Sequence, residues 1–391
     1  MGGSHNGSEA GMRRTIAAKE LVTSSGLLED PLVTMDGGRI VRISTRDSEA
    51  ITQVDHEFPD CTLTPGFLDI HFHGAAGYDV MEARPEALET VARYLARAGV
   101  TKFLPTTVTA SLEATSYALE RMANFIESDT STEAAQAVGI HIEGPFLSHT
   151  KRGMHPAEFL LTPSPELLTR FWEISRGHLK LMTIAPEIPG ALETIAHAVS
   201  LGIRCSMGHS AATRAEAIAA LETGVVSATH TFNAMSAYDH REPGILGVVL
   251  DRADLYADVI CDGVHVSPEA VRLWLRAKGS DRAILITDCL EAAGMPDGKY
   301  KLGQTVVHVA GETCTTEDGV LAGSVISLDR AVENLQQMTG AGLPVASRLA
   351  SINPARMLGL PETLVPGAAA DFNIYDIQGR RLGTILRGVL L

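Results

Sequence analysis

The hydrophobic positions of this 391-residue chain follow two kinds of pattern. Near both ends, in residues 14–64 and 367–391, short apolar stretches alternate with polar residues and are broken by turns such as Asp36-Gly37-Gly38, which is typical of antiparallel strands. In between, continuous apolar runs of strand length are followed by segments of helical periodicity, for example PEALETVARYLARAG at 85–99. We therefore expect a small β-sandwich built from both termini and an α/β middle.

The middle of the chain contains eight apolar runs, which end near His73, Thr106, Glu143, Pro186, His209, His230, Asp262 and Asp288. Their continuity suits parallel strands that helices cover on the outside. Eight strand-helix units predict a TIM (β/α)8 barrel. We place the barrel at 65–356 and the two parts of the sandwich at 13–64 and 357–391. Residues 1–12, which are rich in Gly and Ser, are expected to be disordered.

Composition excludes several classes of partner and site. A formal net charge of −15 without a basic stripe argues against nucleic acid and anionic membranes. No run approaches the roughly 20 apolar residues that span a bilayer, and no signal segment opens the chain, so we expect a cytoplasmic protein. The five cysteines are scattered without CxxC spacing, which indicates neither a disulfide framework nor a thiolate zinc site.

Side chains that can bind a metal stand at the ends of five of these runs. They are His71 and His73 after the first run, Glu143 after the third, His209 after the fifth, His230 after the sixth and Asp288 after the eighth. Active sites of TIM barrels gather at this end of the strands, and residues two apart in a strand share a face. A single histidine or carboxylate could instead bond loop backbone or cap a helix. Together the six predict a site for a divalent metal, zinc first and iron or another first-row metal second.

Seven motifs spread along the chain are HIEGPF, GHSAAT, THTFNAM, CDGVHV, TDCLEAAG, LAGS and NPARMLG. With the HxH of the first run, they resemble the amidohydrolase superfamily and, within it, the N-acetylglucosamine-6-phosphate deacetylase family. The resemblance covers nearly the whole chain. It implies metal-dependent hydrolysis of the acetamide of N-acetyl-D-glucosamine 6-phosphate, which yields D-glucosamine 6-phosphate and acetate in amino-sugar catabolism.

The resemblance also implies which residues hold metal. Glu143, His209 and His230 match the core ligands of the family, with Glu143 as the shared carboxylate. Other barrel amidohydrolases bridge two metals with a carboxylated lysine after strand 4, but here that strand ends TIAPE. Members of the deacetylase branch differ at the first-strand pair, so His71 and His73 leave a second metal site open.

Further matches concern the substrate. By resemblance, His155 and His265 contact the sugar, and His155 helps to stabilise the oxyanion. Asn233 and the backbone of Ala234 contact the phosphate. Arg241 also reaches the phosphate, from the neighbouring subunit of a homodimer. An arginine fork suits phosphate geometry and supplies the local cation that the acidic chain otherwise lacks.

Asp288 matches the catalytic acid/base of the family, which takes a proton from the attacking water and returns it to the departing amine. Two alternatives stay open at this point. The first is a barrel that hydrolyses an N-acyl amino acid or a cyclic amide. FNAM and Arg241 argue against it, because those substrates carry no phosphate. The second is a barrel that binds a sugar phosphate without turnover, and the presence of Asp288 argues against it. N-acetylgalactosamine 6-phosphate is a further alternative substrate, because the C4 hydroxyl is read by pocket geometry.

Overall fold

The computed structural model describes residues 13–48, 54–128 and 131–391. The segment 1–12, for which disorder was predicted, lies outside these residues. The chain forms two compact units, of which the larger is Phe67–Leu360 and the smaller combines the residues up to Gly66 with Pro361–Leu391.

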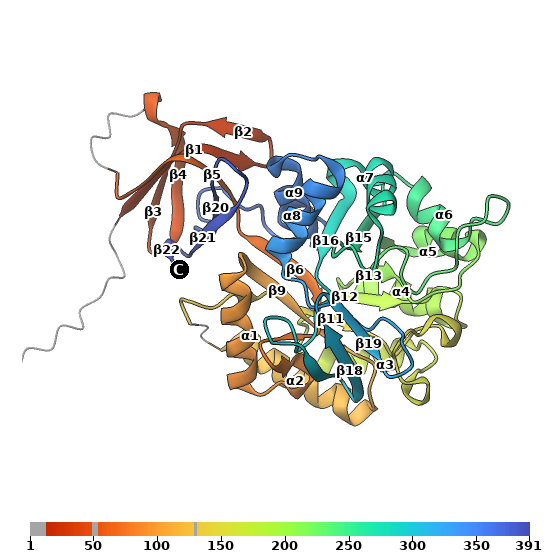
Figure 1. Cartoon of the computed structure of the whole chain (residues 1–391). Coiled ribbons are helices and arrows are strands. Elements are labelled where there is room, and N and C mark those ends of the chain that lie inside the picture. Colours follow the sequence, from red (N-terminus) through yellow and green to blue (C-terminus); the bar gives the residue numbers. More distant parts are fainter. Residues whose placement is uncertain (1–12, 49–53, 129–130) are drawn as a thin grey trace, which may run out of the picture. The chain divides into compact units, whose positions relative to one another are not determined.

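Eight parallel strands make the barrel of the larger unit (Figure 1). They are β6 (Phe67–Phe72), β9 (Val100–Thr107), β11 (Ile140–Glu143), β12 (Leu179–Ile184), β13 (Arg204–Met207), β14 (Val225–Ala228), β15 (Tyr256–Ile260) and β16 (Ala283–Ile286). Each pairs with the next, and a two-residue strand, β10 (Gln136–Ala137), pairs in parallel with β9. The ring closes where the Asp288 N–H donates to the His71 carbonyl oxygen over 2.9 Å. The predicted TIM barrel is confirmed.

Helices follow most of these strands and cover the barrel. They are α1 (Pro85–Arg97), α2 (Leu112–Glu127), α3 (Pro165–Ile174), α4 (Ala191–Ser200), α5 (Arg214–Thr223), α6 (Gly244–Asp251), α7 (Pro268–Arg282), α8 (Leu328–Thr339), α9 (Leu343–Ala350) and α10 (Ile352–Leu358). Helix α1 begins with Pro85 and buries Leu88, Val91 and Leu95, which lie on one face at helical spacing. Serine or threonine caps the N-termini of α2, α3, α5 and α7.

A three-stranded antiparallel sheet lies between β16 and α8, where the sequence analysis placed no element. It consists of β17 (Gly298–Leu302), β18 (Thr305–Ala310) and β19 (Thr313–Thr316). Its apolar side chains, including Leu302, Val307 and Val309, pack with Val108 and Leu290 of the barrel. The insertion is thereby attached to the end of the barrel that carries the predicted site.

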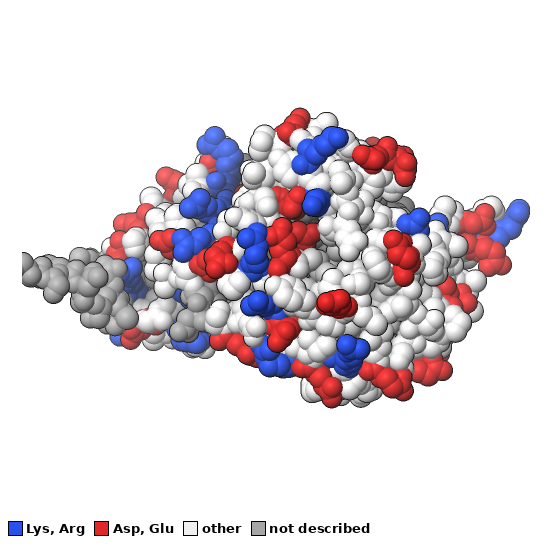
Figure 2. All heavy atoms as spheres, turned by 90° about the horizontal axis from the view of Figure 1, so that it is seen from below, with Lys and Arg blue, Asp and Glu red and all other residues white. Residues whose placement is uncertain are grey.

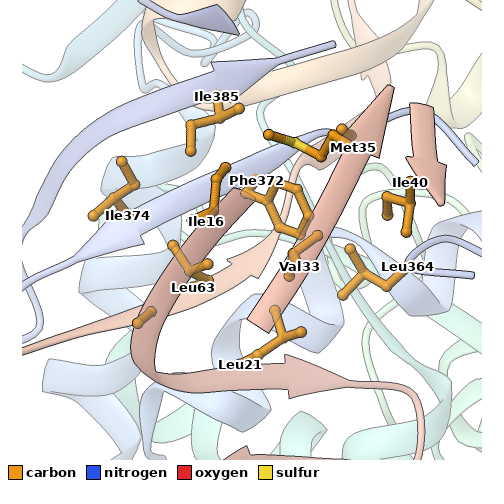
Figure 3. Close-up of a cluster of buried hydrophobic side chains, with 12 residues drawn as sticks. Ile16, Leu21, Val33, Met35, Ile40, Leu63, Leu364, Phe372, Ile374 and Ile385 are labelled. Carbon is orange, nitrogen blue, oxygen red and sulfur yellow. The ribbon is translucent and has the colours of Figure 1, made fainter. Parts of the chain in front are cut away.

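The smaller unit is the predicted β-rich domain of both chain ends. Its strands are β1 (Arg14–Thr23), β2 (Gly26–Glu29), β3 (Pro31–Asp36), β4 (Arg39–Thr45), β5 (His56–Pro65), β20 (Phe372–Tyr375), β21 (Arg381–Leu386) and β22 (Val389–Leu390). They form one sheet in the order β22-β21-β20-β5-β1-β3-β4, with β2 beside β1. Figure 3 shows Ile16, Val33 and Leu63 of the first part meeting Phe372 and Ile385 of the second.

The pairing in this unit corrects one expectation and confirms another. Strands β1 and β5 pair parallel rather than antiparallel, because β3 is antiparallel to both β1 and β4, and β5 lies on the other side of β1 with the same direction as β4. The turn at Asp36-Gly37-Gly38 is present between β3 and β4, with Asp36 opposite Arg39. Gly37 and Gly38 have φ of 54° and 74°, the left-handed values that a tight hairpin turn requires.

Surface charge and helix hydropathy give two further observations. In the face shown in Figure 2, Lys and Arg are interspersed with Asp and Glu and form no continuous basic surface. Within residues 13–48, 54–128 and 131–391, no helix combines the length and the apolar character needed to cross a bilayer.

Candidate active site

A pocket of about 360 Å³ opens at the C-terminal ends of the barrel strands. It is lined by nine of the eleven residues that the sequence analysis selected: His73, Glu143, His155, His209, His230, Asn233, Ala234, His265 and Asp288. His71 is fully buried directly below, with its Nε2 atom 3.4 Å from Asp288 Oδ1. Only Arg241 is elsewhere, exposed in the segment between β14 and α6 and outside the lining of the pocket of its own chain.

Glu143 is the centre of the site, because each of its two oxygens faces a different pair of histidines. Its Oε1 atom lies 3.3 Å from His209 Nε2 and 3.2 Å from His230 Nε2. Its Oε2 atom lies 3.3 Å from His71 Nε2 and 3.2 Å from His73 Nε2. Asp288 Oδ1 completes the second group, 3.1 Å from His73 Nε2. One carboxylate thus joins two histidine pairs, as a carboxylate that bridges two metal ions does.

Two of these histidines are held in the tautomer that binds metal. The Nδ1 atom of His73 faces the Thr106 carbonyl oxygen at 3.1 Å, and that of His209 faces the Lys151 carbonyl oxygen at 2.9 Å. A carbonyl oxygen only accepts, so in both rings Nδ1 carries a proton and Nε2 is the atom that can bind metal. Both Nε2 atoms face the Glu143 carboxylate, where a proton or a metal ion can lie between the two groups.

The separations also fit a metal ion. Ligand atoms that surround zinc tetrahedrally at 2.0–2.1 Å lie about 3.3 Å from one another, close to the Glu143–His209 and Glu143–His230 separations. The buried ring nitrogens of His71 and Nδ1 of His230 have no hydrogen-bond partner within the described residues. His71, His73 and Asp288 form one compact group of possible ligand atoms, and Glu143, His155 and His209 form another.

His155 differs from these ligands by its tautomer. Its Nδ1 atom accepts the Thr109 N–H at 3.3 Å, and the Thr109 hydroxyl lies 2.8 Å away. A neutral ring that accepts at Nδ1 carries its proton at Nε2, which lies 3.6 Å from Glu143 Oε2. His155 is therefore built to donate a hydrogen bond into the pocket rather than to bind metal. His265 shows the opposite pattern, because its Nδ1 atom donates to Asp262 Oδ2 over 2.6 Å and leaves Nε2 as an acceptor.

The backbone at the strand ends is left-handed at three of the site residues. His209, His230 and Asp288 have φ of 48°, 31° and 50°, and each follows its strand by two residues. Residues other than glycine rarely adopt this conformation, and they tend to do so where the surrounding structure holds them at functional sites. The strands therefore end in tight turns that place these side chains beside the pocket.

The charges of the cluster perturb its pKa values. Burial opposes ionisation of Glu143, but the surrounding histidine side chains, His71 foremost, outweigh burial and hold the pKa of Glu143 well below its usual range. Burial also lowers the pKa of His209 to about 4. For His230, burial is outweighed by the bond to Glu143 and by the charges of Glu143 and Asp288, which raise its pKa to about 9.

Two buried carboxylates beside the site were not selected from sequence as metal or catalytic residues. Asp258 in β15 accepts the His230 N–H, and burial raises its pKa to about 7. Asp69 accepts the Thr287 hydroxyl at 2.6 Å and the His71 N–H at 3.3 Å, so it holds the backbone of His71 rather than a histidine ring. A charged residue inside an apolar strand, as in YADVICD, is the signal that could have identified Asp258.

Comparison with known proteins now identifies the family. The profile of the Amidohydrolase family matches residues 62–389. The chain belongs to this family. Among its relatives, N-acetylgalactosamine-6-phosphate deacetylase of Escherichia coli O157:H7 is 37% identical over 368 residues, covering 93% of this chain and 96% of that protein. N-acetylglucosamine-6-phosphate deacetylase of Bacillus subtilis is 34% identical over 373 residues, covering 94% of each.

Solved structures place this amidohydrolase in the deacetylase branch. The Mycobacterium smegmatis N-acetyl-D-glucosamine-6-phosphate deacetylase, solved as a mutant in complex with N-acetyl-D-glucosamine-6-phosphate, superposes with a TM-score of 0.92. It is 30% identical and covers 97% of this chain and 99% of its own. The resemblance inferred from the seven motifs is thus confirmed at the level of the family.

Metal uptake by this amidohydrolase should strengthen as pH rises. A ligand histidine must be neutral, and because the pKa of His230 is raised to about 9, a proton competes with the metal below that pH. Affinity should increase by up to about tenfold per pH unit for each displaced proton, up to about pH 9. Calorimetry of zinc binding in buffers with different ionisation enthalpies measures the protons released. An affinity that does not change with pH would contradict the assignment of His230 as a ligand.

Proposed function

We propose that this chain hydrolyses the acetamide of N-acetyl-D-glucosamine 6-phosphate to D-glucosamine 6-phosphate and acetate, using one or two divalent ions, zinc first. The observation that carries the proposal is Glu143 between two histidine pairs, with Asp288 at the edge of the same pocket. The names of the Bacillus subtilis relative and of the solved structure agree with it, and the Escherichia coli relative is named for the same deacetylation of the galactosamine derivative. The five cysteines are all free, in keeping with a cytoplasmic enzyme.

Five side chains of the site would bind the metal. Glu143, His209 and His230 would hold the first ion, and His71 and His73 would hold a second one that shares Glu143. A bound divalent ion lowers the pKa of a coordinated water and polarises the acetamide carbonyl. These five side chains fix the position of the ion or ions relative to the scissile bond.

Proton transfer falls to Asp288. Burial opposes its ionisation, but the charge of His71 and the contacts with His73 outweigh burial and hold the pKa of Asp288 below its usual range, so it is a carboxylate at neutral pH. Asp288 would accept a proton from the attacking water and give it to the departing amine. His155, with its proton at Nε2, would donate to the developing oxyanion.

The remaining pocket residues suit a sugar phosphate. His265 Nε2 offers an acceptor to a sugar hydroxyl. The turn that follows His230 has positive φ at Phe232 and Ala234, on either side of Asn233. Asn233 and Ala234 in this turn line the pocket and would bind the phosphate.

N-acetylgalactosamine 6-phosphate is the second candidate substrate, because the relative with 37% identity is named for it. The two sugars differ at C4 alone. An assay of acetate release with both sugar phosphates, and with unphosphorylated N-acetylglucosamine, tests the proposal. We expect release from the glucosamine derivative at the highest kcat/KM. Preference for the galactosamine derivative would transfer the assignment to that sugar, and release from neither would refute the proposed function.

In the same assay, Arg241→Ala should raise KM for the phosphorylated sugar by about tenfold or more, with little effect on the unphosphorylated one. The physical reason is that a chain of net charge −15 repels a phosphate at long range and depends on a few donors at short range. An exposed arginine that pairs with Asp254, Arg252, provides the matched control. Equal loss with both substrates would contradict a phosphate role for Arg241.

We further propose that Arg241 serves the site of the partner subunit in a homodimer, because it does not line the pocket of its own chain. Mixing an Arg241→Ala chain with an Asp288→Asn chain tests this arrangement. Mixed dimers should regain one site with an intact Asp288 and the partner's arginine. Failure to regain activity after subunit exchange has been confirmed would place the function of Arg241 within its own chain.

A further inference from the structure

The motif LAGS, at 321–324, has no part in the chemistry described above, yet it runs beside the catalytic strand end. Ser324 forms a parallel bridge with Cys289, directly after Asp288. At its other end the segment joins the β17–β19 sheet, where Leu321 bridges Thr315 and the Ala322 N–H donates to the Cys314 carbonyl oxygen over 3.2 Å. The four residues therefore connect the insertion to the turn that carries Asp288.

Ser324 makes three hydrogen bonds to the turn around Asp288. Its hydroxyl donates to the Thr287 carbonyl oxygen over 2.6 Å, and its N–H donates to the Asp288 carbonyl oxygen over 2.8 Å. Its own carbonyl oxygen accepts the Leu290 N–H at 3.1 Å. The side chain is 1% exposed, so water cannot replace these bonds.

The contacts of Ser324 restrain the backbone of Asp288. Asp288 has a φ of 50°, in the left-handed region that residues other than glycine adopt uncommonly and often at functional sites. Its N–H is fixed by the His71 carbonyl oxygen at 2.9 Å, and its carbonyl oxygen is fixed by Ser324. Ser324 thus supplies one of the two backbone restraints on the residue that transfers the proton.

Gly323 allows the segment 321–324 to approach the backbone of Asp288 closely. A Cβ atom on Gly323 would lie 3.0 Å from the Asp288 carbonyl oxygen and 3.2 Å from Leu290 Cδ2, and the φ of Gly323 is 62°. Glycine is therefore required both for the space and for the backbone conformation. Any larger residue would press on the Asp288 backbone.

The insertion also reaches the pocket itself. Val320 and Leu321 line the pocket and are 47% and 37% exposed. A sugar ring in the pocket would cover part of this surface. The same short segment thus touches the space for the substrate at one end and the backbone of Asp288 at the other.

We propose that Ser324 is a positioning residue for Asp288, and that Gly323 and Ser324 make the β17–β19 sheet part of the catalytic apparatus. The inference rests on the proposed role of Asp288 as the proton-transferring group. It concerns kcat rather than binding, since misplacing a reacting group by about 1 Å can cost up to about 10² in rate.

The primary test is Ser324→Ala, which removes the two hydroxyl bonds, to the Thr287 carbonyl oxygen and from the Ile326 N–H, and keeps the backbone bonds. We expect kcat for acetate release to fall by about tenfold with KM within about twofold. Ser351→Ala is the matched control, because Ser351 is also 1% exposed and its hydroxyl also donates to a carbonyl oxygen, that of Ser347, over 2.6 Å. Its kcat should stay unchanged, although both variants should lose similar thermal stability.

A second pair of variants tests the close approach. Gly323→Ala should lower kcat by at least as much as Ser324→Ala. Gly340→Ala introduces the same change at a φ of 75° with no atom within 4 Å, and it should leave kcat unchanged. If Ser324→Ala cannot be purified as a folded protein, the comparison of these two glycine variants decides the question.

The double variant separates positioning from a general structural effect. If Ser324 acts through Asp288, then Ser324→Ala should cost almost nothing further in an Asp288→Asn background. An equal loss in both backgrounds, or an unchanged kcat in the single variant, would overturn the inference. Near-normal turnover of Asp288→Asn alone would instead refute the proposed role of Asp288, and this inference with it.

Discussion

Removing the divalent metal from the purified protein should abolish acetate release, and returning zinc should restore it. The Nε2 atoms of His73 and His209 face the Glu143 carboxylate, and the proposed chemistry requires a divalent ion between these groups. Loss of metal polarisation costs several kcal/mol of transition-state stabilisation, or about 10³-fold in rate. The experiment is chelation followed by zinc add-back. Metal analysis gives the metal content at each stage, and the acetate assay gives the activity.

Glu143→Gln gives the same test by mutation. The amide keeps the shape of the side chain but removes the charge that both histidine pairs share, so metal content and activity should fall together. Glu127→Gln is the matched control, because Glu127 is an exposed carboxylate that pairs with Arg176 and His178 and does not line the pocket. Full activity in a verified metal-free sample would refute the mechanism.

Asp288→Asn should lower kcat by a factor of about 10² or more, the usual scale of general acid and base catalysis. The variant keeps the size of the side chain and loses the ability to accept a proton. The ion held by Glu143, His209 and His230 should stay bound, because the contacts of Asp288 are with His71 and His73. Steady-state kinetics together with metal analysis distinguish loss of the proton acceptor from loss of metal.

Asp254→Asn provides a control for this substitution, since Asp254 is an exposed carboxylate paired with Arg252. Its kcat should match that of the unmodified protein. A normal kcat for Asp288→Asn would move the proton transfer to another group, and His155 would then be the next residue to test.

The sequence by itself determined the features that depend on local periodicity. Eight apolar runs with helices between them predicted the barrel, and HxH in the first run predicted that His71 and His73 lie side by side. Because side chains alternate along a strand and parallel strands end at the same edge of a barrel, six separated residues could be assigned to one site. The turn at Asp36-Gly37-Gly38 could also be predicted, because it depends only on neighbouring residues.

Tertiary structure decided how those residues are held, because the groups that hold them are remote in sequence. The tautomer of His209 depends on Lys151, 58 residues away, and that of His73 on Thr106, 33 residues away. The parallel pairing of β1 with β5 joins strands far apart in the chain, and the support of Asp288 by Ser324 depends on the return of the β17–β19 insertion to β16. The hydrophobic periodicity of the sequence indicates toward which face of a strand or helix a side chain points. Its hydrogen-bond partners depend on the closed barrel, which brings backbone groups that are distant in sequence together.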